Sequence, residues 1–155
     1  MQNALFNYVN ETVSSNDHFT PKWVFDLLGL EFDIDVAAPV NGVPYIPCKR
    51  WFSQADDGLT QDWAGLVWCN PPYSNILPWV KRLNLHRNGV ALLPHTKGAW
   101  RREIWENADA IVEWSTISEI KFNYNGKDKT IFPTTFLAGW GAVAIKALEN
   151  VGRVR

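Results

Sequence analysis

The sequence predicts a three-layer α/β fold, in which a mostly parallel sheet has helices on both faces and ends in an antiparallel hairpin. Two short, continuous apolar runs, at residues 66–69 and 89–94, have the composition of strands buried on both faces of a parallel sheet. Segments with helical spacing follow both runs, and this alternation is typical of a parallel sheet. The last third of the chain has short apolar segments between turn residues, which predicts the hairpin.

The chain has the length of one domain, at 155 residues, and its 46% hydrophobic and 20% charged residues form a globular composition. No repeat or linker divides it, so we expect a flexible arm over residues 1–16 and a single domain over residues 17–155. No run approaches the roughly 20 apolar residues that cross a bilayer, and the N-terminus lacks the features of a signal peptide. The expected compartment is therefore the cytoplasm, with Cys48 and Cys69 reduced.

The first regular element is expected to be a helix. Thr20 is a suitable N-cap, Pro21 suits the first helical position, and Gly29 ends the apolar stripe that follows. Residues 31–38 then alternate apolar and acidic side chains with a period of two, which predicts a strand. Three prolines and a glycine make residues 39–47 a loop.

The remaining elements follow from the same signals. Apolar runs bounded by turn residues predict strands, and apolar positions at helical spacing predict helices. The expected strands are residues 50–52, 66–69, 89–94, 110–114, 120–122, 130–132 and 135–138. The expected helices are residues 78–86 and 99–107, and the expected turns lie at residues 56–58, 125–126 and 132–133.

The net charge of −1 conceals an asymmetry between the two halves of the chain. Residues 1–77 carry three bases against nine acids, a net charge of −6, whereas residues 78–155 carry twelve bases against seven acids, a net charge of +5. Such a division indicates an acidic site beside a surface that faces a polyanion. The alternative interpretation is scattered solvated charge, and the sequence leaves both open.

Asn70, Pro71, Pro72 and Tyr73 follow directly after an apolar run, at the place where ligands bind in an open α/β sheet. The prolines stiffen the turn and lack N–H groups. The Asn70 side-chain oxygen and the Pro71 carbonyl are therefore suited to accept hydrogen bonds from the amino group of a planar base, which favours the localised lone pair needed for attack on an electrophile. Tyr73 is suited to stack on such a base, flipped out of a duplex. The alternative is a proline-rich turn in which Asn70 is only a cap.

The order of several motifs resembles that of the phage-type DNA N-6-adenine methyltransferases (Dam-like), among the amino-methyltransferases that carry an NPPY box. The resemblance covers roughly residues 17–137. Its motifs are residues 19–21, 32–38, 41, 57–59, 62–63, 68–74, 79–80, 92–94 and 120–122. It implies an abbreviated Rossmann-like methyltransferase sheet, S-adenosylmethionine as cofactor and adenine in DNA as substrate.

The resemblance also implies which residues bind the methyl donor. The cofactor-binding candidates are Phe19, Thr20, Pro21, Asp33, Asp35, Ala37 and Asp57. Asp35 is expected near the donor's amino group or sulfonium, with Ala37 leaving backbone room, and Asp57 is expected near the donor's adenine. The alternatives are that Asp33 and Asp35 face solvent on an edge strand and that Asp57 only forms a turn.

Two features depart from the family pattern. The chain lacks a Gly-rich loop after the first strand, and only 35 positions separate Asp35 from Asn70. Two complete strand–helix units need about 60 residues, so the middle of the fold is expected to be abbreviated.

Basic residues in the second half of the chain are candidates for DNA contact. They are Lys81, Arg82, Lys97, Arg101, Arg102 and Lys121. Together they suit a track for phosphates, although any one pair alone is more typical of a solvated surface. His86 and His95 have no partners at zinc-site spacing, so no metal is expected.

The expected activity is S-adenosylmethionine-dependent methyl transfer to the N6 of a flipped adenine in DNA, in the cytoplasm of a bacterial host if the chain is phage-encoded. Methylation of cytosine N4, RNA adenine or protein glutamine remains an alternative, because the NPPY box also serves glutamine. A non-catalytic relative that binds DNA or the donor is the alternative from another class. The missing Gly-rich loop and the short middle favour that last interpretation.

Overall fold

The computed structural model describes residues 20, 22–113, 121–124, 127–130 and 135–155. Its helices are α2 (Lys22–Leu28), α3 (Leu77–His86), α4 (Trp100–Asn107) and α5 (Ala142–Val151). Its strands are β1 (Phe32–Asp35), β2 (Cys48–Trp51), β3 (Val67–Cys69), β4 (Gly89–Pro94), β5 (Ala110–Glu113), β6 (Lys121–Tyr124), β7 (Lys127–Thr130) and β8 (Thr135–Trp140). The expected N-terminal arm lies outside the described residues.

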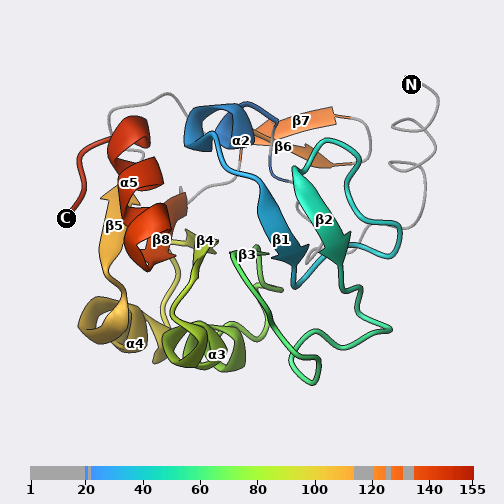
Figure 1. Cartoon of the computed structure of the whole chain (residues 1–155), viewed down its shortest axis with the longest axis horizontal. Coiled ribbons are helices and arrows are strands. Elements are labelled where there is room, and N and C mark those ends of the chain that lie inside the picture. The colour runs from blue at the N-terminus through green and yellow to red at the C-terminus, as the bar shows by residue number, and fades with distance from the viewer. Residues whose placement is uncertain (1–19, 21, 114–120, 125–126, 131–134) are drawn as a thin grey trace.

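Six of these strands form one mixed sheet, in the order β2-β1-β3-β4-β8-β5. The pairs β1–β2, β1–β3 and β3–β4 are parallel, whereas β8 runs antiparallel between β4 and β5. Helices α2 and α5 pack on one face of the sheet and α3 and α4 on the other (Figure 1). This arrangement confirms the expected mostly parallel, Rossmann-like α/β fold with helices on both faces.

The antiparallel hairpin and the last strand differ from expectation. The hairpin is formed by β6 and β7 as a separate two-stranded sheet, with its second strand earlier in the chain than expected. All six residues of β8 are buried, and β8 pairs along its whole length with β4, from Gly89–Trp140 to Pro94–Thr135. A continuous apolar strand is typical of a position in which both faces of the sheet are covered, and β8 contributes to the core on both faces. The expected turns at residues 125–126 and 132–133 lie outside the described residues.

Strand β1 contains an irregularity that directs its side chains to both faces. The N–H groups of Asp33 and Ile34 both donate to the Leu66 carbonyl, at 2.8 and 3.4 Å. Phe32 consequently packs with α2 and α5, while Ile34 packs with α3 and α4. The expected alternation of side chains between the two faces over residues 31–38 is therefore wrong beyond Phe32, because Phe32 and Ile34 lie on opposite faces. The strand ends at Asp35.

The middle of the fold is abbreviated, as expected. Residues 36–66 are all described and contain β2 and turns but no helix. Parallel strands are usually joined through a crossover helix. Here, loops without a helix connect β1, β2 and β3. These loops are important because they pass the carboxyl ends of β1 and β2.

Helix α5 has no counterpart among the elements expected from the sequence. Its buried face is formed by residues at helical spacing: Ala144, Ala147, Leu148 and Val151. Gly141 precedes it with a φ of 89°, which suits glycine. The helical spacing of these apolar residues is visible in the sequence, shortly after the expected strand at residues 135–138.

Candidate functional site

The four residues Asn70, Pro71, Pro72 and Tyr73 lie where the sequence predicts them, in the connection between β3 and α3. All three residues of β3 are buried, and β3 lies between the parallel strands β1 and β4. Pro78 stands in the first turn of α3, where its missing N–H costs no helical hydrogen bond. The motif is therefore held at the carboxyl edge of the sheet, which is the ligand-binding edge of an open α/β fold.

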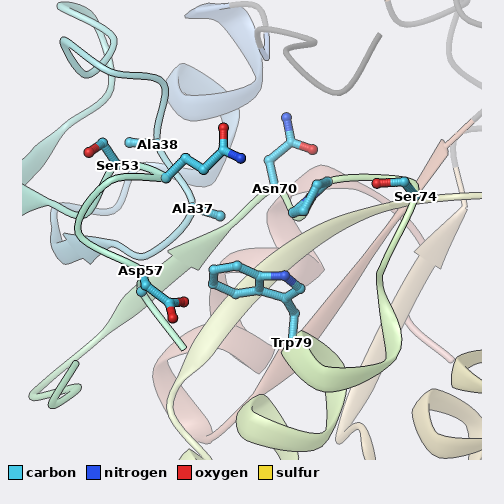
Figure 2. A pocket seen from close by; sticks show the side chains of 10 residues that line it. Ala37, Ala38, Ser53, Asp57, Asn70, Ser74 and Trp79 are labelled. Carbon is cyan, nitrogen blue, oxygen red and sulfur yellow. The ribbon is translucent and has the colours of Figure 1, made fainter. Parts of the chain in front are cut away.

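A pocket of about 230 Å³ opens beside this motif (Figure 2). Loops that follow three different strands contribute to it, and α3 contributes one indole. Its lining residues are Ala37, Ala38, Ser53, Gln54, Asp57, Gly58, Asn70, Pro72, Ser74 and Trp79. Figure 2 shows the Trp79 indole lying across the pocket between Asp57 and Ser74. The fold thus brings together Ala37 and Asp57, two donor candidates, with Asn70 and Pro72 of the motif.

Asn70 is tied to the segment that precedes α2. Its Nδ2 donates a hydrogen bond to the Thr20 hydroxyl at 3.3 Å. Thr20 is 2% exposed, and its carbonyl accepts a hydrogen bond from the Tyr45 hydroxyl at 2.7 Å. Because Nδ2 points at Thr20, the Asn70 Oδ1 is directed the other way. Tyr45 was not expected at the site, and no local pattern marks it.

Asp57 and Gly58 form the pocket wall opposite the motif. Asp57 has a φ of 53°, a left-handed conformation that aspartate tolerates better than most residues. Its carbonyl accepts hydrogen bonds from the N–H and the hydroxyl of Thr60, both at 2.9 Å. A Cβ on Gly58 would lie 2.0 Å from the Val36 carbonyl oxygen, so the close approach requires glycine. Asp57 therefore both forms a turn, as predicted, and lines the pocket.

Asp33 makes contacts of a structural kind. Its Oδ2 accepts a hydrogen bond from the Leu66 N–H at 2.7 Å, and its Oδ1 lies 3.3 Å from the Lys49 ammonium. The backbone hydrogen bond, and then the lysine, lower the pKa of this carboxyl. Asp33 is absent from the lining of the pocket among the described residues.

Asp35 is a buried carboxyl at the end of β1. It is 2% exposed, and β1 lies inside the sheet between β2 and β3, so the alternative of a solvent-facing edge residue is wrong. Burial raises its pKa to about 7, opposed by a hydrogen bond of 3.3 Å from the Ala37 N–H. A carboxylate in such a place is strongly stabilised by a nearby cation.

Tyr73 is partly buried against the core cluster that contains Val80 and Phe136. Burial raises the pKa of its phenol above the ordinary value. The phenol is therefore neutral at physiological pH, and Tyr73 is not among the described residues that line the pocket.

The basic candidates for DNA contact differ in their surroundings. Lys81, Lys97 and Arg101 are exposed. Arg102 is exposed but bonded to Glu106 at 2.7 Å. Arg82 instead donates to two backbone carbonyls of the loop before β3. Lys121 lies in β6, for which the structure describes the backbone.

Two donor candidates, Phe19 and Pro21, lie outside the described residues. Within the described part of the chain, no group of three or more His, Cys, Asp or Glu side chains is arranged to hold a metal ion. The same residues include no helix long and apolar enough to cross a membrane.

Comparison with known proteins places these features in context. The model of the family described as DNA N-6-adenine-methyltransferase (Dam) matches residues 10–134 of this chain. A DNA N-6-adenine-methyltransferase of Haemophilus phage HP1 (strain HP1c1) is 35% identical over 117 residues, which cover 68% of this chain and 65% of the relative. The chain thus spans less than two thirds of that relative's length. No solved structure matches the chain.

Proposed function

This chain belongs to the DNA N-6-adenine-methyltransferase (Dam) family, and we propose that it transfers a methyl group from S-adenosylmethionine to the exocyclic N6 of adenine in DNA. S-adenosylmethionine, when bound, supplies an electrophilic methyl group on a sulfonium. One observation carries the proposal: Asn70 and Pro72 line the same pocket as Ala37 and Asp57. The motif suited to an amino group therefore adjoins the residues suited to a methyl donor.

Asn70 and Pro71 activate the adenine in this proposal. The Asn70 Oδ1 and the Pro71 carbonyl accept hydrogen bonds from the N6 amino group, which favours the transition state in which the nitrogen lone pair is localised. The nitrogen forms a bond to the methyl carbon as the bond from that carbon to sulfur breaks, and a proton leaves the nitrogen for solvent. The Tyr73 ring stacks on the flipped base and Pro72 keeps the turn rigid.

The pocket residues fit a donor that carries a cationic centre and an adenosine. Asp57 accepts hydrogen bonds from the adenosine, whose rings pack on the Trp79 indole. Ala37 leaves room for close approach. Asp35 is buried outside the pocket lining and accepts a hydrogen bond from the Ala37 N–H, and its carboxylate favours the donor's positive charge from there. Phe19, Thr20 and Pro21 remain the proposed segment that wraps the donor, whereas the contacts of Asp33 favour a structural role.

DNA is the proposed partner of the basic half of the chain. Lys81, Lys97 and Arg101 are exposed and are the first candidates for phosphate contacts. Arg102 and Lys121 remain proposed contacts as well. The proposed setting is the cytoplasm of a bacterial host.

The direct test incubates the purified chain and methyl-labelled S-adenosylmethionine with DNA, RNA or protein. Label in N6-methyladenine of DNA is expected. Label in cytosine N4, RNA or glutamine would replace the proposal by the corresponding alternative. Absence of donor binding in calorimetry, with and without DNA, would favour a non-catalytic relative.

The mechanism is tested separately with Asn70→Ala and Tyr73→Ala. Loss of the Asn70 acceptor is expected to lower kcat by about 100-fold or more, by analogy with the removal of one preorganised donor from an oxyanion site. Donor affinity should change little. Tyr73→Ala is also expected to abolish turnover, and full turnover in either variant would overturn the mechanism.

A further inference from the structure

We infer that Arg82 is a positioning residue for the donor pocket, which it serves by holding the loop that carries Asp57, and that it is not a phosphate contact. The inference rests on the proposed function, because it takes the pocket to be the donor site. Arg82 stands on α3, directly after the motif-bearing turn, so sequence position alone suggested DNA contact.

The guanidinium of Arg82 is bound to the loop before β3 at two points. Its Nη1 donates to the Leu59 carbonyl and its Nη2 donates to the Gln61 carbonyl. Its Cζ lies 4.6 Å from the ring centroid of Trp63, in a cation–π arrangement. A planar guanidinium makes such a two-point contact in one fixed orientation, and an ammonium group does not.

The same loop forms one wall of the pocket. The Trp63 Nε1 donates to the Gly58 carbonyl at 2.8 Å. The Trp63 indole also stacks on Trp79, with ring centroids 6.5 Å apart and an interplanar angle of 20°. Asp57, Gly58 and Trp79 all line the pocket. Arg82 therefore fixes Trp63, and through it both the Gly58 backbone and the Trp79 indole.

The two hydrogen bonds to the loop occupy both Nη groups of Arg82, and bidentate phosphate recognition would compete for these groups. Moving them to DNA would release two carbonyls and the face of Trp63 together. The observed contacts thus favour a role in which Arg82 keeps the wall in place while the donor binds.

The test compares Arg82→Lys and Arg82→Gln with the matched variant Arg87→Lys. Arg87 directly follows α3, and its guanidinium also makes a two-point contact. It donates to the Asn107 carbonyl at 2.6 Å and to the Asp109 carboxylate at 2.5 Å. Those contacts lie away from the pocket residues. Arg82 thus joins α3 to the loop before β3, and Arg87 joins the end of α3 to the segment between α4 and β5. Of the two, only Arg82 contacts the loop that carries the pocket residues Asp57 and Gly58.

Five quantities are measured: S-adenosylmethionine affinity by calorimetry, donor KM, kcat, the salt dependence of DNA affinity, and Tm. Both Arg82 variants are expected to weaken donor affinity by about tenfold and to raise donor KM, with kcat at saturating donor nearly unchanged. The slope of log affinity against log salt for DNA should stay constant. Arg87→Lys should lower Tm comparably without changing donor affinity.

Three results would overturn the inference. Arg82→Lys could bind the donor as the unaltered chain does, which would leave only a role in stability. Arg82→Gln could reduce the salt slope by about one, the mark of a lost phosphate contact. Hydrogen exchange at residues 57–63 could be no faster in Arg82→Lys than in Arg87→Lys, which would show that Arg82 does not hold this loop. If the unaltered chain itself binds no donor, the proposed function fails. That result differs from the three above, so the two failures are distinguishable.

Discussion

Asp33 and Asp35 stand two positions apart in β1, and the surroundings of their carboxyl groups displace their pKa values in opposite directions. Asp33 accepts a backbone hydrogen bond from Leu66 and faces Lys49. Asp35 is buried, with a hydrogen bond from the Ala37 N–H. The two residues therefore affect stability with opposite dependence on pH, and each gives a prediction.

Replacing Asp33 by Asn is expected to lower stability at neutral pH. A carboxyl whose folded pKa is lowered contributes stability above its unfolded pKa of about 3.9, and this stability is lost as pH falls through the folded pKa. Solvent screening limits the loss to about 1 kcal/mol, or about 2–4 °C in Tm. Thermal unfolding at pH 7 and pH 3 measures it, and the difference between the two proteins should shrink at pH 3. A tenfold loss of donor affinity would instead place Asp33 at the donor.

Replacing Asp35 by Asn is expected to stabilise the chain without its donor at alkaline pH. A carboxyl whose folded pKa is raised to about 7 favours folding most below pH 4, and this stability is lost as pH rises toward 7. A displacement of about three pKa units sets an upper limit of about 4 kcal/mol on the gain at pH 8. Denaturant unfolding at pH 8 and pH 4 measures it, and the gain should vanish at pH 4.

The same Asp35→Asn variant should bind S-adenosylmethionine more weakly, by about tenfold, because the carboxylate that favours the donor's cation is gone. A stabilised protein with weaker donor binding would show that the buried acid serves function at the expense of stability. Equal unfolding free energies of Asp35→Asn and the unaltered chain at both pH 8 and pH 4 would contradict the buried, ionisable state of Asp35.

Replacing Thr20 by Val is expected to slow methyl transfer. Valine keeps the shape of threonine but removes the oxygen that accepts from the Asn70 Nδ2. A hydrogen bond of this kind is worth about 0.5–1.5 kcal/mol, so kcat should fall by about two- to tenfold. Single-turnover rates at saturating donor and DNA provide the measurement. Thr20→Ser keeps the hydroxyl and should retain most of the rate, and equal rates for Val and Ser would show that the bond has no catalytic effect.

Replacing Gly58 by Ala is expected to damage the pocket wall. The new Cβ would lie 2.0 Å from the Val36 carbonyl oxygen and 3.2 Å from the Trp79 ring, so the loop must shift. Overpacking of this kind costs about 1–3 kcal/mol, and donor affinity should fall by about tenfold. Chemical denaturation and calorimetry measure the two effects.

The matched control for Gly58 is Gly29→Ala. Gly29 has a φ of +62° but no atom within 4 Å of an added Cβ. Its replacement should cost about 1–2 kcal/mol of backbone strain and leave donor affinity unchanged. If both variants lose donor affinity equally, general destabilisation rather than the pocket wall would explain the result.

Much of the fold could be predicted from local patterns. The apolar runs at β3 and β4 and the helical stripes of α2, α3 and α4 appear where the sequence predicts them, because burial and helical periodicity leave a mark on neighbouring residues. The motif at residues 70–73 was placed at the sheet edge for the same reason. Helix α5 also has a local signal, and it could have been predicted from the spacing of its buried residues.

The pairing of the last strand could not be predicted in this way. β8 joins β4 and β5, from which it is separated by long stretches of chain, and strand pairing is decided by such non-local contacts. The irregularity at Asp33 and Ile34 is likewise set by the carbonyl of Leu66, the residue that precedes β3. It decides which face each side chain of β1 takes.

The sequence by itself determined the α/β class and the place of Asn70 and its prolines, since each depends on residues that are close together in the chain. It also determined the family resemblance, which depends on the order of short motifs along the chain. The tertiary structure alone decided what the charged side chains do. It gave Asp33 a backbone hydrogen bond and buried Asp35, and it directed Arg82 toward the loop before β3. The reason is that hydrogen-bond partners and burial come from segments distant in sequence. The sequence specifies the charge of a residue, but the fold determines which groups contact that residue.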